Sequence, residues 1–100
     1  MRVVEHKMLN AIKSRKSMRC DNTEVVTFGD VSEVYLHGNK VAEISPNYVY
    51  VQDCGWQTVT TKSRINAILR SYNLGNVSAK KFQWFVNGAK WHGSFLGEIK

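Results

Sequence analysis

The chain has 100 residues, of which 43% are hydrophobic and 22% are charged, which predicts one globular domain over residues 1–100 and excludes a disordered protein. No segment approaches the roughly 20 apolar residues that span a bilayer, and the first residues lack the features of a signal peptide, so a cytoplasmic protein without membrane contact is expected. The net charge is +6, with basic residues concentrated in 1–20 and 62–90 and acidic residues in 21–61; this favours an anionic partner, although a basic stretch is often only a solvated face.

The first predicted element is a helix. Apolar residues recur there at spacings of three and four, at Met1, Val4, Met8, Ala11 and Ile12. The helix is expected to fray over residues 14–17, and a turn is expected at residues 21–23.

A change of period then predicts strands over residues 24–28, 32–37, 40–44 and 48–52. Hairpin turns are expected at Gly29 and Asp30 and again at Gly38 and Asn39, because these residues tolerate the backbone of a tight turn.

A second helix follows, with Ile65, Ile68, Leu69 and Tyr72 along one face. Thr60 or Thr61 is expected to cap its start, and Gly75 is expected to end it. Ser63, Ala67 and Arg70 are expected to point away from the apolar face.

The last predicted element is a hairpin, with strands over residues 82–86 and 89–92 around Asn87 and Gly88. A two-residue turn there pairs Val86 with Ala89 and places Trp84 opposite Trp91. The predicted order is α-β-β-β-β-α-β-β. We therefore expect an α+β fold, an antiparallel sheet of hairpins with an N-terminal helix and a second helix packed on one face.

Periodicity also predicts which side chains form the core. The predicted core consists of Val4, Met8, Ile12, Leu36, Val41, Val49, Val51, Trp56, Ile65, Ile68, Leu69, Tyr72, Trp84 and Val86.

Motifs for catalysis and for metal binding are absent from the sequence, so we expect a protein that binds rather than catalyses. Cys20 and Cys54 are too few for a disulfide framework and are expected to be reduced. The three histidines lack metal-ligand spacing, so neither a metal nor another cofactor is expected.

Two segments are candidate anion sites. In the last hairpin, aromatic residues such as Phe85 alternate with Lys80, Lys81 and Lys90, which favours stacked bases beside neutralised phosphates. The alternative is that Trp84 and Trp91 are a cross-strand core pair. At the start of the second helix, free amide protons and the positive end of the helix dipole favour an anion beside Thr60, Thr61, Lys62, Ser63 and Arg64. The alternative for the threonines is capping alone.

The remaining predicted contacts are basic side chains elsewhere, namely Arg70, Lys13, Arg15, Lys16 and Arg19. Lys62 and Arg64 are expected to matter more than the N-terminal cluster, because a rigid helix start holds them, whereas the cluster lies where the first helix frays.

Parts of the sequence resemble a group of small proteins encoded by tailed bacteriophages. The resemblance covers about residues 22–92 and rests on YLHGN at 35–39, DCGWQTVTTKSRINAIL at 53–69 and QWFVNG at 83–88. It implies an accessory protein without an assigned activity, made in the cytoplasm of the infected bacterium, and it transfers no catalytic residues.

Two functions follow as expectations. In the first, the basic surface contacts nucleic acid or nucleotide phosphates with little sequence specificity. In the second, the protein is a small inhibitor that binds a host protein, for example a defence or metabolic enzyme. The placement of the charge favours nucleic acid.

Overall fold

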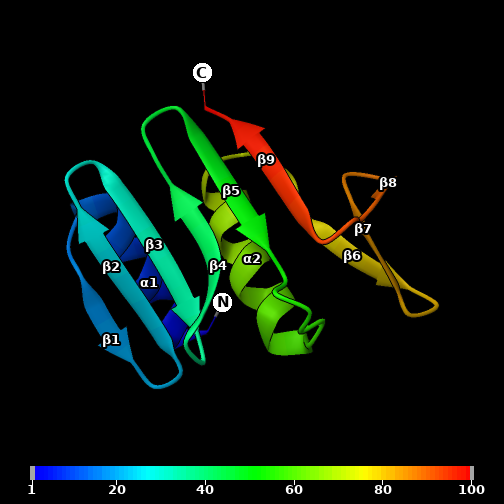
Figure 1. The fold of residues 1–100 in the computed structure, drawn as a ribbon, viewed down its shortest axis with the longest axis horizontal. Coiled ribbons are helices and arrows are strands. Elements are labelled where there is room, and N and C mark those ends of the chain that lie inside the picture. The colour runs from blue at the N-terminus through cyan, green and yellow to red at the C-terminus, as the bar shows by residue number, and fades with distance from the viewer. Residues whose placement is uncertain (1, 100) are drawn as a thin grey trace.

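The computed structural model describes residues 2–99, which form two helices and nine strands (Figure 1). In chain order these are α1 (Val3–Ser14), β1 (Met18–Cys20), β2 (Thr23–Phe28), β3 (Val31–Leu36), β4 (Asn39–Ile44), β5 (Tyr48–Gln52), α2 (Val59–Ser71), β6 (Val77–Lys80), β7 (Gln83–Val86), β8 (Ala89–Lys90) and β9 (Ser94–Glu98). The predicted α+β class is confirmed, with three strands, β1, β6 and β9, beyond the predicted order. Neither helix in the described part is long and apolar enough to cross a membrane.

The strands form two separate antiparallel sheets instead of the expected one. The larger has the order β1-β2-β3-β4-β5-β9, and the smaller has the order β6-β7-β8. Both helices lie against one face of the larger sheet and leave its other face open (Figure 1). The chain leaves α2, builds the smaller sheet beside it, and returns as β9 to pair with β5.

The end of α1 differs from the predicted frayed segment. Arg15 takes a left-handed backbone conformation (φ 54°), and the Lys16 amide donates to the carbonyl of Ala11 at 2.9 Å, which closes the last turn. The next residue, Ser17, accepts a hydrogen bond from the Thr27 amide on β2 at 3.0 Å. The N-terminal basic cluster is therefore carried by ordered backbone. Met1, predicted on the apolar face of this helix, lies outside the described residues.

The start and end of α2 also differ from prediction. Thr58, rather than Thr60 or Thr61, is the N-cap, and its hydroxyl accepts a hydrogen bond from the Thr61 amide at 3.1 Å. The helix ends at Ser71, before Gly75, and Ala67 is buried rather than turned outward. The small side chain of Ala67 allows neighbouring elements to approach this side of the helix.

Two of the three predicted hairpin turns are confirmed. Phe28 pairs with Val31 across the first, and Val86 pairs with Ala89 across the last. The middle turn lies one residue earlier than predicted, because Leu36 pairs with Asn39 and the positive φ angles fall on His37 and Gly38.

Most of the predicted core is confirmed. The buried members are Met8, Ile12, Leu36, Val41, Val49, Val51, Ile65, Ile68, Leu69, Trp84 and Val86. Val4 and Tyr72 are half-buried. The prediction that Trp56 belongs to the core is wrong, since 61% of its surface is exposed. It follows a turn at the end of β5 that carries it past the edge of the core.

The smaller sheet is held to the rest of the molecule by buried contacts. Trp84 and Trp91 are both buried, with ring centroids 5.8 Å apart, so the core-pair alternative is the correct one. The Trp91 indole donates to Asp53 at 2.8 Å, and the Asn66 side chain makes two hydrogen bonds to the backbone of Val77. These contacts fix β6, β7 and β8 beside α2.

Candidate functional site

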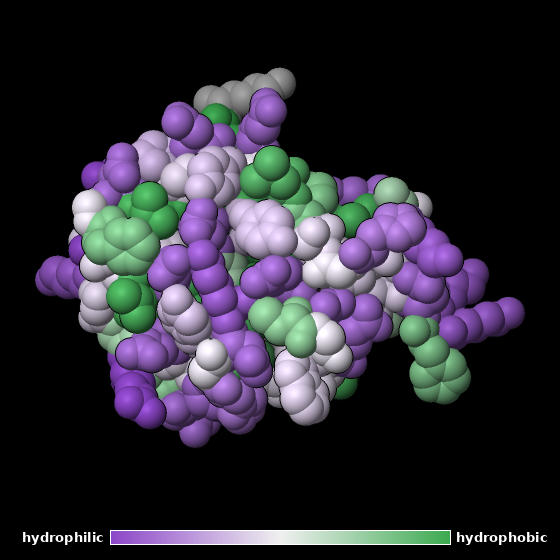
Figure 2. Space-filling model, viewed as in Figure 1, coloured by the Kyte–Doolittle hydropathy of each residue, from purple (hydrophilic) through white to green (hydrophobic). Residues whose placement is uncertain are grey.

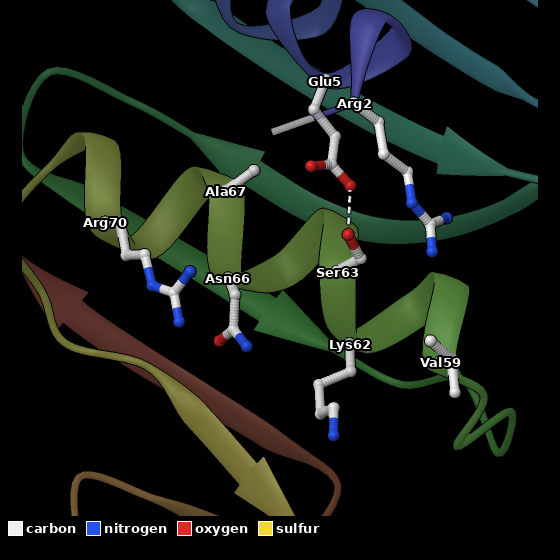
Figure 3. A pocket seen from close by; sticks show the side chains of 8 residues that line it. All are labelled: Arg2, Glu5, Val59, Lys62, Ser63, Asn66, Ala67 and Arg70. Carbon is white, nitrogen blue, oxygen red and sulfur yellow. Dashed lines mark hydrogen bonds between the residues drawn. The ribbon is translucent and has the colours of Figure 1, made fainter.

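The outward-facing side of α2 forms the floor of a shallow groove of about 750 Å³ (Figure 3). Lys62, Asn66 and Arg70 project from the helix on this side, and Arg2, just before α1, lies at the other wall. The sequence predicted Lys62 and Arg70 as contacts but missed Arg2, which nothing in the local sequence connects to α2.

A second hollow, of about 360 Å³, continues from the first turn of α2 to the turn between β6 and β7. Val59 and Lys62 line both hollows, while Lys80 and Lys81 line only the second. We call Arg2, Lys62, Arg70, Lys80 and Lys81 the basic surface.

The cations of the basic surface have no acidic partners among residues 2–99. The ion pairs in that part of the chain join Lys40 to Glu33 and Glu43, and Arg64 to Glu5. Glu5 does line the groove, but its charge is matched by Arg64. The basic surface therefore carries positive charge that only solvent, ions or a partner can neutralise.

Arg64, which the sequence predicted as an anion contact, is buried in an ion pair and is not part of this surface. It is 3% exposed, and its guanidinium donates to Glu5 at 2.8 Å, to Thr23 at 2.9 Å and to Asn22 at 3.2 Å. Ser63 donates to the same Glu5 carboxylate (Figure 3). The arginine joins α2 to α1 and β2, and so fixes the helix that presents Lys62.

The two threonines of the predicted helix-start site have different surroundings. Thr61 is 2% exposed and its hydroxyl is hydrogen-bonded to that of Thr58, so capping explains it. Thr60 is half-buried and faces a different hollow, described below. Of the predicted set, Lys62 is the cation that reaches the basic surface.

The turn between β6 and β7 has an unusual backbone. Its two central residues, Lys81 and Phe82, have φ angles of 51° and 67°, a left-handed conformation that bulky side chains seldom adopt. Phe82 is fully exposed. The turn thus holds an aromatic ring in solvent directly after two lysines, at a cost in backbone strain. The sequence predicted Phe82 in a strand over residues 82–86, whereas the structure places it in this turn.

The other hairpin residues lie on the outer face of the smaller sheet. Phe85 is half-buried and pairs with Ser78 on one side and Lys90 on the other. Alternation along the strands places Lys80 on this same face. Phe85 and Lys90 line neither of the two hollows, so the structure does not place them on the basic surface.

The predicted N-terminal cluster is not brought to α2's groove. Lys13, Arg15, Lys16 and Arg19 are exposed, and Lys13 lies 5.9 Å from the ring centre of Tyr72. These residues lie at or beyond the end of α1 opposite to Arg2, which the rise of a 12-residue helix puts about 18 Å away.

The open face of the larger sheet has the opposite charge. Lys40 donates to Glu33 and Glu43 at 2.6 Å each, and the hydroxyls of Tyr35 and Tyr48 donate to the same carboxylates. In Figure 2 a hydrophilic band runs between apolar patches on this face. Hydrogen bonds from Lys40 hold the pKa of both glutamates below its usual value.

This network predicts an acid-sensitive contribution to stability. Because the glutamate pKa values are lowered on folding, the contribution is present above the ordinary pKa of 4.5 and is lost as the pH falls through the folded values. We expect Lys40→Met to lower the free energy of unfolding by about 1 kcal/mol at pH 7, and by progressively less as the pH falls below about 4.5.

Urea unfolding over a series of pH values measures this difference. Lys7→Met, which removes an exposed lysine of α1, is the matched control and should show no pH-dependent difference from the unaltered protein. A Lys40→Met difference that stays constant down to pH 3 would contradict the assignment.

Within residues 2–99 no group of three histidine, cysteine, aspartate or glutamate side chains is placed to hold a metal ion. Cys20 and Cys54 are free thiols, the first half-buried and the second exposed.

Comparison with known proteins matches the chain to a protein family. The family model described as Kyanoviridae Gp96 protein matches residues 1–98. No curated protein and no solved structure matches the chain significantly.

Proposed function

The chain belongs to the Kyanoviridae Gp96 protein family and is a phage accessory protein, and we propose that it binds nucleic acid through the basic surface without catalysing a reaction. The ligand is the sugar–phosphate backbone of a strand with unpaired bases. The protein acts in this way in the cytoplasm of the infected bacterium.

One observation carries the proposal, which is the convergence of unpaired cations from three parts of the chain. Arg2 comes from the start of α1, Lys62 and Arg70 from α2, and Lys80 and Lys81 from the small sheet. Residues so far apart in sequence share this surface only because the fold brings them together. Because ordered backbone carries these cations, binding to phosphates costs the entropy of their side chains but not that of the backbone.

The first turn of α2 adds a favourable electrostatic term. Thr58 satisfies the Thr61 amide, while the amides of Val59 and Thr60 precede it in the open first turn. The positive end of the helix dipole lies beside Lys62, between the two hollows. A phosphate group at this position is attracted both by the helix dipole and by the Lys62 ammonium group.

Phe82 supports a strand with unpaired bases over a regular duplex. Its exposed ring follows Lys80 and Lys81 and lines the same hollow, so a base can stack on the ring while its phosphates contact the lysines. Backbone strain at an exposed aromatic is typical of functional positions. Contacts to phosphates carry no sequence information, so discrimination between sequences should be weak.

Binding of fluorescently labelled 20-nucleotide strands, followed by anisotropy, tests the proposal. At low salt we expect both single-stranded DNA and RNA to bind, with dissociation constants that vary only a few-fold among unrelated sequences. Binding should weaken to roughly 10⁻⁴–10⁻⁶ M at physiological salt. Absence of binding to any strand at low salt would contradict the proposal.

The open face of the larger sheet favours a second candidate function, inhibition of a host protein. Phe28 and Leu96 are 54% and 59% exposed on strands of this sheet, and Leu96 pairs with Tyr50, which in turn pairs with Glu43 of the network. Such a surface suits a partner with basic and apolar side chains. It becomes the leading candidate if nucleic acid does not bind and if Leu96→Asp abolishes capture of a purified host enzyme.

A further inference from the structure

A third hollow, of about 460 Å³, lies between the β3–β4 hairpin and the start of α2. Its volume is within the range of small-molecule pockets. Buried Leu36 and Val41 contribute apolar surface to it, and Trp56 stands at its side. The residues thus form a concave apolar site beside an exposed indole.

Trp56 is held firmly although it is exposed. Its amide donates to the carbonyl of Asp53 at 2.8 Å, which closes a turn through Cys54 and Gly55. The Asp53 carboxylate accepts a hydrogen bond from the Gly55 amide at 2.8 Å, and the Cys54 thiol donates to the Lys40 carbonyl at 2.8 Å. The indole is therefore presented by an ordered loop and needs no rearrangement to bind a flat ring.

The polar groups of the pocket suit an uncharged ring with hydrogen-bonding edges. His37, Asn39 and Thr60 line it, and together they offer both donors and acceptors. Asp53 also lines it, with its carboxylate engaged by the Gln57 amide and the Trp91 indole.

The negative charge of Asp53 favours an uncharged ring over a phosphate as the group inside this pocket. Burial raises the pKa of Asp53, but the hydrogen bonds from Gln57, Gly55 and Trp91 outweigh burial and lower it below its usual value. The carboxylate is therefore ionised at neutral pH and disfavours a phosphate inside this pocket.

The pocket adjoins the basic surface. Thr58 lines both this pocket and the hollow that contains Lys62, Lys80 and Lys81. One threonine thus separates an apolar site next to a tryptophan from a site rich in unpaired cations. A ligand that joins a planar polar ring to a phosphate matches both halves of this arrangement.

We infer that this pocket binds a nucleobase, stacked on Trp56 with its edge toward His37, Asn39 and Thr60, while the attached phosphate lies against Lys62 beyond Thr58. The inference rests on the proposed function, since it places one nucleotide of the bound strand. A free nucleotide has the same chemistry, and the experiment separates the two sources.

The intrinsic fluorescence of Trp56 reports on the site, because Trp84 and Trp91 are buried whereas Trp56 is 61% exposed. Three probes are titrated: a five-nucleotide single strand, the same strand without its bases, and the nucleoside monophosphates. Each is titrated against the unaltered protein, while Trp56→Ala and Trp56→Phe are measured by anisotropy with labelled probes. Thermal melts confirm that both variants are folded, since replacing an exposed side chain should not affect folding.

We expect each stacked base, one on Trp56 and one on Phe82, to tighten binding about 5- to 150-fold relative to the abasic strand. Trp56→Ala should reduce the difference between the two strands by about 5- to 150-fold, the share of one stacked base, whereas Trp56→Phe should keep most of it. Bound strand should protect Trp56 from acrylamide quenching. Monophosphates that bind as well as the strand, with the same dependence on Trp56, would identify a free nucleotide as the ligand.

Other results overturn the inference. Equal affinity for the two strands, or a difference that Trp56→Ala leaves unchanged, would show that Trp56 stacks no base, while binding of the abasic strand would leave the proposed function intact. Binding of monophosphates alone would support the pocket and contradict the proposed function. Absence of binding by all three probes would contradict both.

Discussion

Replacing Arg64 with alanine should lower the free energy of unfolding by about 3–5 kcal/mol, the usual cost of breaking a buried ion pair. The reason is that Glu5, only 3% exposed, would lose its charged partner in a site closed to water. Thr23 and Asn22 would lose hydrogen bonds at the same time. The contact also joins α1 to α2, so the backbone amides of both helices should become less protected from hydrogen exchange.

Urea unfolding followed by circular dichroism measures this effect. Glu5→Gln/Arg64→Met removes both charges and should recover much of the loss, because replacing a whole buried pair costs less than leaving half of it. Arg19→Ala, an exposed arginine, is the matched control and should change stability by less than about 0.5 kcal/mol. A similarly small effect for Arg64→Ala would show that the pair is solvated in solution.

Removing three lysines of the basic surface should have the largest effect on function. We expect Lys62→Ala/Lys80→Ala/Lys81→Ala to weaken binding of a 20-nucleotide single strand by about 100-fold, from roughly 1 kcal/mol for each charged contact. The three side chains line one hollow, so they contact neighbouring phosphates of the same strand. Stability should change little, since all three are outside the buried core.

Lys13→Ala/Lys16→Ala/Arg19→Ala is the matched control, because it removes the same charge at the other end of α1. Arg15 is left in place, since its left-handed backbone serves as the cap of the helix. We expect the control to weaken binding less than about 10-fold by loss of long-range attraction alone. A loss equal to or larger than that of the other variant would place the site at the N-terminal cluster.

The local part of the fold could be predicted from the sequence. Both helices have apolar residues at helical spacing, and Asn87 and Gly88 form the turn that their types favour. The strands that were missed lack such signals. β9 pairs with β5 from more than 40 residues away, and β6 joins β7 through Lys81 and Phe82, residues untypical of a tight turn.

The candidate site could be predicted only in part for the same reason. Lys62, Lys80 and Lys81 were expected from their place beside a helix start and a hairpin. The sequence around Arg64 gives no indication that Glu5, 59 residues earlier, neutralises it. Likewise a large aromatic residue such as Trp56 is expected in the core from its type alone. The turn that follows Asp53 places it at the surface instead.

The salt dependence of binding tests the central claim most directly, because it counts the phosphates that the basic surface neutralises. On a single strand each contact contributes about 0.7 to the slope of log K against log salt concentration. We predict that Lys62→Ala/Lys80→Ala/Lys81→Ala makes this slope shallower by about 2 than in the unaltered protein. An unchanged slope would show that these lysines contact no phosphate and would contradict the account.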